Sequence, residues 1–262
     1  MACYDALPCH LDEAVKATKD NFSLQAQSYS RFRPDYPQAL YDHLYELSPA
    51  FDRALDCATG NGQVAYALAQ QFTEVHATDI SQAQLDNARQ AANIHYAVAR
   101  AEATQFPAEH FDLITVGQAY HWFDFEAFGQ EANRLLKPGG IIAIWSYHLP
   151  RFNPAINELV DDFYQNVVAP YWDPERDWVD RYYQDVPFHF QEVQTDFSFE
   201  IAKAFTLSDW EGYLNTWSAV RHYMKQRGTS PVPAHMEKMA KVWNEPTYNA
   251  VFPGFVRMGN KL

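Results

Sequence analysis

Short apolar runs alternate with amphipathic stretches through the first 150 residues of the chain. Four runs close at Asp56, Asp79, Ala99 and Gly117, and a fifth run, IIAIW, begins at Ile141. The stretches between them carry apolar residues at helical spacing. This alternation predicts repeated βα units around a parallel sheet, with the ligand crevice outside the carboxyl ends of the strands.

The first unit, residues 54–81, reads ALDCATGNGQVAYALAQQFTEVHATDIS. It combines a strand, a turn of small residues at Ala58, Gly60 and Gly62, a helix, and a second strand that ends at Asp79. In a right-handed βαβ unit this order places backbone N–H groups and a helix N-terminus beside a carboxylate, which suits the two hydroxyl groups of a ribose. The third glycine position of a dinucleotide motif comes one residue early, so the loop favours a nucleoside without a pyrophosphate.

The chain after Pro150 departs from this repetition. Its aromatic and acidic segment YWDPERDWVDRYYQDVPF lies between the fifth and sixth predicted strands and is expected to act as a lid. The other predicted elements are a helix that starts at Asn153 and Pro154, a strand at 193–202, a long helix opened by Ser208 and Glu211 that stops at Gly228, and a last strand at 249–258. We expect Trp210, Leu214 and Trp217 of the long helix to belong to the core.

Composition limits the partners. The chain has 262 residues and a net charge of −13, without a cluster of lysines or arginines, which argues against a nucleic-acid partner. No apolar stretch approaches the ~18 residues that span a bilayer, and no secretion signal is recognised, so we expect no membrane partner. Cys3, Cys9 and Cys57 are expected to be reduced thiols of a cytoplasmic protein. Two of them with His10 lack a fourth spaced ligand, and no metal is predicted.

Five segments carry a resemblance to a known family. They are DCATGNGQ, ATDIS, AEATQFP, FDLITVGQAYHWFD and RLLKPGGIIAIW. In order and spacing they resemble the class I S-adenosylmethionine-dependent methyltransferases, over about residues 22–146. The upstream FSLQAQSYSRFRPDYPQAL and the tail are similar to the branch that contains trans-aconitate methyltransferase and related small-molecule carboxyl methyltransferases. Ala58 stands where the family usually has its first glycine, and alanine is small enough to keep the turn.

The resemblance implies an α/β fold of the Rossmann-like, three-layer type. A mostly parallel seven-stranded sheet would have an antiparallel last strand and helical lid insertions. A single methyltransferase domain would cover residues 1–262, with a cofactor-binding core at about 50–147 and lid elements at about 20–48, 150–190 and 207–245. The implied cofactor is S-adenosyl-L-methionine.

The residues implied for cofactor binding lie at strand ends and in the segment before the first strand. They are Tyr29, Arg33, Asp56, Ala58, Gly60, Gly62, Asp79, Ile80, Ala101, Glu102 and Gln118. The family pattern gives Glu102 the adenine amino group and places Ile80 against the adenine face. Tyr29 and Arg33 would fold over the methionine end, and Arg33 could instead pair with an acidic substrate.

The loop after the fourth strand should face the methyl donor. The expected substrate contacts are Arg33, Tyr120, His121 and Trp122. His121 is the candidate catalytic residue, either as a hydrogen-bond donor to the substrate or as its base, and a structural role for the His121–Trp122 pair stays open. His148 and His222 are further histidines near the predicted crevice.

These features favour a small-molecule O-methyltransferase with a carboxylate acceptor, acting as a monomer or homodimer. In-line positioning and water exclusion can supply up to ~7–11 kcal/mol of the barrier reduction. An ionised carboxylate needs no base, whereas a hydroxyl or ammonium acceptor must lose a proton, for which histidine is the natural acceptor. Two alternatives stay open: a non-catalytic cofactor-binding subunit that activates a partner, and a nicotinamide oxidoreductase, which the glycine spacing disfavours.

Overall fold

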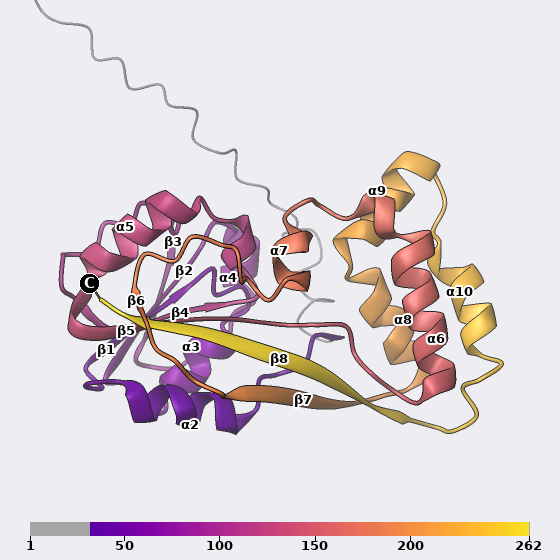
Figure 1. Ribbon diagram of the computed structural model, residues 1–262, viewed down its shortest axis with the longest axis horizontal. Coiled ribbons are helices and arrows are strands. Elements are labelled where there is room, and N and C mark those ends of the chain that lie inside the picture. The colour runs from indigo at the N-terminus through magenta and orange to yellow at the C-terminus, as the bar shows by residue number, and fades with distance from the viewer. Residues whose placement is uncertain (1–31, 262) are drawn as a thin grey trace, which may run out of the picture.

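The computed structural model describes residues 32–261 and shows a mixed sheet with helices around it (Figure 1). The strands are β1 (Arg53–Cys57), β2 (Glu74–Asp79), β3 (Ile94–Val98), β4 (Phe111–Gly117), β5 (Leu136–Tyr147), β6 (Gln191–Glu192), β7 (Ser198–Phe205) and β8 (Tyr248–Asn260). The α-helices are α2 (Gln38–Leu47), α3 (Gln63–Leu68), α4 (Gln82–Leu85), α5 (Phe125–Leu135), α6 (Pro154–Asp162), α7 (Arg176–Asp180), α8 (Leu207–Asn215), α9 (Ser218–Arg227) and α10 (Val232–Met239). Short helical turns are η2 (Tyr120–Trp122), η3 (Phe163–Val167) and η4 (Ala169–Tyr171). Within the described range, no helix has both the length and the apolar character that crossing a bilayer requires.

The strand order is β3-β2-β1-β4-β5-β8-β6, and β7 also pairs with β8. Strands β1 to β5 pair in parallel, and β8 runs antiparallel to β5. The other edge of β8 pairs with β7 and then with β6, so these two strands lie end to end. The predicted fold with its antiparallel last strand is confirmed. One correction concerns the count: the sheet has eight strands instead of seven, because β6 and β7 both pair with β8 at its last position.

Local contacts explain why this last position is divided. A strand is predicted at 193–202, but β7 begins only at Ser198. The Thr195 hydroxyl accepts a hydrogen bond from the Phe197 N–H at 3.0 Å, and the Phe197 ring stacks on His43 of α2 with 4.1 Å between ring centroids. These contacts draw residues 194–197 toward α2 and away from the β8 ladder.

The long helix predicted over 208–228 is two helices, α8 and α9. The Thr216 hydroxyl donates to a backbone carbonyl three residues earlier at 2.6 Å, and Trp217 is extended before α9 begins. The capping box of α8 is formed by Thr206 and Asp209, two residues before the predicted pair. The predicted end at glycine is confirmed, since the chain leaves α9 through a left-handed Gly228.

Helices cover both faces of the sheet. α2 and α3 pack on one face with Ala54, Leu113 and Trp145, whereas α5 packs on the other with Leu55 and Ile114. Successive residues of one strand therefore point into opposite layers, as the pleat of a strand requires. This arrangement is the predicted three-layer sandwich.

Helices α6, α8, α9 and α10 gather beyond one end of the sheet, and α7 lies between this group and the sheet (Figure 1). Trp210, Leu214 and Trp217 are buried there, which confirms that they belong to the core. The chain passes from β5 toward α6 (Figure 1), so the carboxyl ends of the parallel strands face the helical group.

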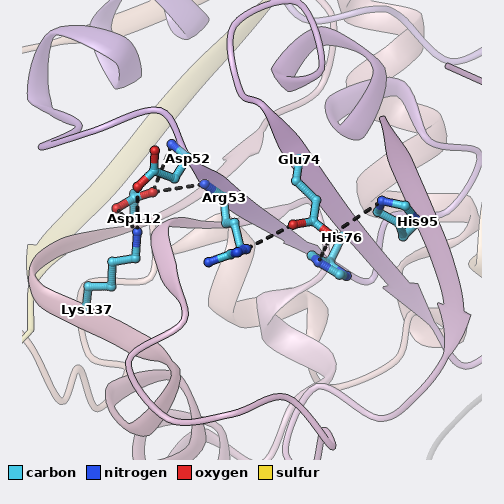
Figure 2. Close-up of polar contacts among 7 residues, drawn as sticks. All are labelled: Asp52, Arg53, Glu74, His76, His95, Asp112 and Lys137. Carbon is cyan, nitrogen blue, oxygen red and sulfur yellow. Dashed lines mark hydrogen bonds and ion pairs between the residues drawn. The ribbon is translucent and has the colours of Figure 1, made fainter. Parts of the chain in front are cut away.

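Charged side chains connect the strands at their amino ends, opposite the ends that face the helical group (Figure 2). The buried carboxylate of Asp112 on β4 accepts hydrogen bonds from the backbone N–H groups of Asp52 and Arg53, at 3.1 and 2.9 Å. Lys137 of β5 donates to the same carboxylate at 2.8 Å. The Arg53 guanidinium reaches Glu74 of β2 at 2.9 Å. The amino ends of β1, β2, β4 and β5 are thereby joined by polar contacts.

We expect Asp112→Ala to lower the free energy of unfolding by ~2–4 kcal/mol, because it leaves two backbone N–H groups without their acceptor and leaves Lys137 with its contact to Asp52. Urea unfolding followed by tryptophan fluorescence measures the loss. Asp161→Ala is the control, because its exposed ion pair with Arg151 at 2.7 Å should contribute less than ~1 kcal/mol. Equal losses in the two variants would contradict the role assigned to Asp112.

Candidate functional site

The turn after β1 has an unusual backbone. Ala58, Gly60 and Gly62 all have positive φ, at 53°, 56° and 75°. A Cβ atom at Gly60 would meet nothing within 4 Å, so open space lies beside this residue. A Cβ atom at Gly62 would collide with the Tyr96 hydroxyl. The turn is therefore open at Gly60 and closely packed at Gly62.

The carboxylate of Asp56, within β1, is buried and supports this turn. It accepts hydrogen bonds from the Thr59 hydroxyl at 2.5 Å, the Thr115 hydroxyl at 2.9 Å and the Ala65 N–H at 3.2 Å. Burial raises the pKa of Asp56 to about 7, although these hydrogen bonds act in the opposite direction. Asp56 thus joins the turn to β4 and α3, and any effect on the cofactor passes through the position of the turn.

Asp79 ends β2 beside the turn. Its Oδ2 accepts a hydrogen bond from the Gly60 N–H and its Oδ1 one from the Ser81 N–H, both at 2.9 Å. Ile80, the next residue, is 37% exposed, and Val98, opposite Asp79 on β3, is 53% exposed. A fixed carboxylate next to exposed apolar side chains suits the ribose and base of a nucleoside. Val98 was not predicted from the sequence.

Ala101 and Glu102 follow the end of β3. Ala101 is buried, and Glu102 Oε1 accepts a hydrogen bond from the Asp124 N–H at 3.1 Å, at the start of α5. The other Glu102 oxygen lies 3.5 Å from Arg100 Nε. Glu102 therefore links the loops that follow β3 and β4. Tyr29, also predicted for the cofactor, lies outside the described residues.

A cavity of about 60 Å³ lies where the ends of β4 and β5 meet the helical group. Its aromatic walls are Trp122, Tyr147, Trp172, Tyr213 and Trp217. Its ionisable side chains are Arg33, His121, His148, Asp173 and Arg176. Gln118, predicted for the cofactor, also lines the cavity, so the strand-end residues and the cavity are contiguous.

Two arginines from distant parts of the sequence line this cavity. Arg33 Nη1 donates to the Tyr147 hydroxyl at 3.1 Å, and its guanidinium lies 5.2 Å from the centre of an aromatic ring of α8. Arg176, with an 18% exposed side chain, donates from Nε to the Tyr164 hydroxyl at 3.2 Å and lies 3.2 Å from Asp180. Both guanidinium groups are thereby held in defined positions.

Basic side chains outnumber acidic ones in the cavity lining, although the whole chain has a net charge of −13 and Asp180, outside the lining, pairs with Arg176. Arg33 and Arg176 outnumber Asp173, the acidic residue of its lining. Burial, and then the charge of Arg176, lower the pKa of His148, so this histidine is neutral at pH 7. A positive pocket with apolar walls concentrates small anions.

The predicted substrate residues divide between the cavity and the core. His121 and Trp122 line the cavity, and His121 Nδ1 lies 2.8 Å from the hydroxyl of Tyr183, shortly after α7. Tyr120 is buried, packs on α5 and donates to the Pro187 carbonyl at 2.9 Å. The structure therefore does not bring Tyr120 to the cavity, and we withdraw it as a substrate contact.

Sequence reasoning missed Arg176, Tyr183 and the ring of Tyr213. Arg176 lies in the aromatic and acidic segment expected to act as a lid, but nothing in that segment marks which charged residue turns inward. Of the two histidines left unplaced, His148 lines the cavity, whereas His222 contacts the Tyr171 carbonyl at 2.9 Å and does not line it.

Comparisons with known proteins agree with this geometry. Residues 55–144 match the family model described as a methyltransferase domain. A proposed methyltransferase of Dictyostelium discoideum is 32% identical over 228 residues, which cover 86% of this chain and 86% of that protein. The solved structure of a proposed type II methyltransferase from Anaeromyxobacter dehalogenans is 36% identical, with a TM-score of 0.81 over 88% of this chain and 99% of that chain. A malonyl-[acyl-carrier protein] O-methyltransferase of Enterobacter lignolyticus is 34% identical over 128 residues, 45% of this chain and 51% of that protein.

The chain belongs to the class I S-adenosylmethionine-dependent methyltransferases. It is an enzyme, and its cofactor is S-adenosylmethionine. The open turn at Gly60, the carboxylate of Asp79 and the exposed side chains of Ile80 and Val98 fit the nucleoside part of this cofactor. The contacts assigned to individual residues stay predictions.

The left-handed turn predicts opposite effects on stability for substitutions at Ala58 and Gly60. Ala58→Gly should raise the free energy of unfolding by ~0.5–1 kcal/mol, because it relieves crowding of Cβ at positive φ. Gly60→Ala should lower it by a similar ~1 kcal/mol, since it introduces that crowding. Urea unfolding of the cofactor-free protein measures both effects. Shifts of the same sign would contradict the left-handed conformation of one residue.

Proposed function

We propose that this enzyme methylates the carboxylate of a small organic acid, as the branch with trans-aconitate methyltransferase does. The observation that carries the proposal is the pair Arg33 and Arg176 in the lining of one cavity. Acidic side chains outnumber basic ones in the chain as a whole. An anionic ligand therefore explains two arginines in the lining of one cavity better than a contribution to solubility does.

The two arginines would bind and orient the acid. A guanidinium presents a planar set of donors that matches the two oxygens of a carboxylate. Arg33 is held by Tyr147, and Arg176 by Tyr164 and Asp180, so little side-chain freedom is lost when the acid binds.

The residues proposed to hold the cofactor lie along the ends of β1 to β4. They are Gly60, Asp79, Ile80, Ala101, Glu102 and Gln118. S-adenosylmethionine, when bound, supplies a methyl group carried by a positively charged sulfur. Gln118 belongs both to this set and to the cavity lining, which supports an acceptor site directly beside the cofactor site.

A carboxylate acceptor is ionised at neutral pH, so the enzyme need not remove a proton. The remaining tasks of the chain are to hold the acid in line and to exclude water. Large rings such as those of Trp122, Trp172 and Trp217 suit the second task, because they present mainly apolar surface to the cavity.

We propose that the three helical segments predicted as lids act together, around a cofactor-binding core at about 50–147 of a single methyltransferase domain. Each supplies cavity residues: Arg33 comes from the first, Arg176 from the second and Tyr213 from the third. Contributions from three separate segments are expected of a lid that closes over a bound acid.

The Enterobacter relative supports a carboxylate acceptor. Its name states O-methylation of a malonyl group attached to a carrier protein, and the free end of a malonyl group is a carboxylate. The match covers 45% of this chain, so it supports the class of reaction only. Which acid is bound would depend on the residues of the cavity.

Asp79→Asn should weaken binding of S-adenosylhomocysteine by ~10- to 100-fold, because the amide lacks one of the two acceptor oxygens offered to the ribose. Isothermal titration calorimetry measures the affinity. Asp86→Asn, at an exposed acid that accepts a hydrogen bond from Gln82, is the control and should bind as the wild type does. An Asp79→Asn variant with wild-type affinity would remove Asp79 from the site.

Arg176→Gln should lower kcat/KM for an acid substrate by ~10- to 100-fold, with unchanged affinity for S-adenosylhomocysteine, because one charged donor pair is lost. The acids to screen are trans-aconitate, a malonyl thioester and phenylacetate, each with its carboxamide as the uncharged analogue. Release of S-adenosylhomocysteine measures turnover, and base-labile product identifies a methyl ester.

Arg181→Gln is the matched control, because Arg181 belongs to the same segment, is 44% exposed and pairs with Asp177 at 2.9 Å. It should keep full turnover. Methylation of the carboxamides, or a base-stable methyl ether as product, would overturn the carboxylate assignment.

A further inference from the structure

A second cavity adjoins the cavity that is lined by Arg33 and Arg176. Its volume is about 290 Å³, compared with about 60 Å³ for the first cavity. His148 and Leu149, which follow β5, line both cavities, so the two spaces meet at these residues. The other walls of the second cavity come from α6, η3, the end of α7 and β8.

The first cavity is too small for a whole organic acid. A volume of about 60 Å³ holds only a few water molecules. It can take a carboxylate beside Arg33 and Arg176, but the rest of a larger acid has to lie outside it. The second cavity supplies adjoining space of about five times that volume.

His148 carries an unmatched polar atom where the two cavities meet. Its Nε2 is buried and has no hydrogen-bond partner among the described residues. Its ring packs on Tyr182 and Phe255, with 4.2 and 5.4 Å between ring centroids. A buried polar atom without a partner is costly, so this atom indicates a place where a ligand supplies the hydrogen bond. A hydroxyl group suits it, because a hydroxyl can donate or accept and so matches Nε2 in either neutral tautomer.

The charged side chains of the second cavity are already paired. Arg151 Nη1 donates to both oxygens of Asp161, at 2.7 and 3.0 Å. Asp180 accepts a hydrogen bond from the Tyr164 hydroxyl at 2.7 Å and pairs with Arg176 at 3.2 Å. A second carboxylate in this cavity would therefore lie near two acidic side chains and an arginine that is already neutralised. An uncharged polar group avoids this repulsion.

We propose that the second cavity extends the acceptor site and binds the uncharged, hydroxyl-bearing part of an elongated monocarboxylic acid. This inference rests on the proposed function, which places the carboxylate beside Arg33 and Arg176. His148 is then a specificity-determining residue, because it contacts the ligand where the two cavities meet.

Acids of different length and charge test this assignment. Propionate represents an acid confined to the first cavity, hexanoates with one hydroxyl group on any carbon from 3 to 6 represent the extended acid, and adipate carries a second carboxylate. We expect kcat/KM for the best hydroxyhexanoate to exceed that for propionate and for adipate by at least ~10-fold. Equal values for propionate and every hydroxyhexanoate, or a preference for adipate, would overturn the proposal.

A substitution that fills the second cavity tests its location. Gln165 is an exposed residue of its lining, and Gln165→Trp should lower kcat/KM for the best hydroxyhexanoate by ~10-fold while that for propionate stays unchanged. Asn166→Trp is the matched control, because Asn166 is the next residue, is exposed and does not line the cavity. Equal losses for both acids in Gln165→Trp would make the cavity a passage and overturn its role in binding.

His148→Phe tests the hydrogen bond at the junction. The phenyl ring keeps the packing on Tyr182 and Phe255 but lacks Nε2. The preference for the best hydroxyhexanoate over hexanoate should fall from at least ~10-fold to about onefold. His95→Phe, at a 55% exposed histidine near the amino end of β3, is the control and should keep the preference. A preference that His148→Phe leaves unchanged would overturn the role of His148.

Binding measurements separate this inference from the proposed function. Isothermal titration calorimetry of the enzyme saturated with S-adenosylhomocysteine gives the affinity for each acid. If a hydroxyhexanoate binds more tightly than propionate, and Gln165→Trp removes the difference, but no acid is methylated, the proposed function fails and the second cavity stands as a binding site. If propionate and the hydroxyhexanoates are methylated equally well, the proposed function stands and the extended site is overturned.

Discussion

The buried carboxylate of Asp56 is the contact on which the conformation of the turn after β1 depends. It is bonded to the glycine turn through Thr59, to β4 through Thr115 and to α3 through the Ala65 N–H. The turn, the helix that follows it and the distant strand β4 thereby share one acceptor in a region of low dielectric, where an unmatched polar group is costly. The turn can hold left-handed residues because its base is fixed in this way. In this position the Gly60 N–H donates a hydrogen bond to Asp79, which ends the neighbouring strand.

Charge distribution separates the cavity from the rest of the surface. Several exposed arginines pair with carboxylates, as Arg181 does with Asp177 and Asp185. Arg33 and Arg176 contact tyrosine hydroxyls and aromatic rings in the cavity region, and Arg176 also pairs with Asp180 at 3.2 Å. A tyrosine hydroxyl fixes a guanidinium without neutralising it. The net charge of −13 disfavours non-specific binding of anions to the chain as a whole.

The sequence predicted the parts of this enzyme that repeat with a local pattern. The βα alternation, the strand ends at Asp79 and Gly117 and the helix start at Asn153 are all found as expected. The part of the chain after β5 was less predictable, because side-chain contacts decide where its elements begin and end. Phe197 stacks on His43 before β7, and the Thr216 hydroxyl donates to a backbone carbonyl between α8 and α9. Local propensity carries no information about such tertiary contacts.

The candidate site also has a part that the sequence predicted and a part that it did not. Residues at strand ends could be found because parallel topology brings the carboxyl ends of strands together. Arg176 and Tyr183 could not, because their positions depend on how one short segment folds back onto the sheet. Tyr120 was misplaced for a related reason: adjacent residues of a tight helical turn point in different directions, and only its neighbours His121 and Trp122 reach the cavity.

The antiparallel strand β8 explains how that short segment is held. Arg257 of β8 donates from Nη1 to the backbone carbonyls of Tyr183 and Val186, at 2.8 and 3.0 Å. Tyr182 and Tyr183 have positive φ, at 60° and 55°, a conformation that residues with a Cβ adopt only when surrounding contacts compensate for it. The hydrogen bonds from Arg257 and the burial of the Tyr183 ring supply that compensation. Arg176 begins the same segment, so Arg257 of the sheet holds the end of the segment that supplies Arg176 to the cavity and Tyr183 to His121.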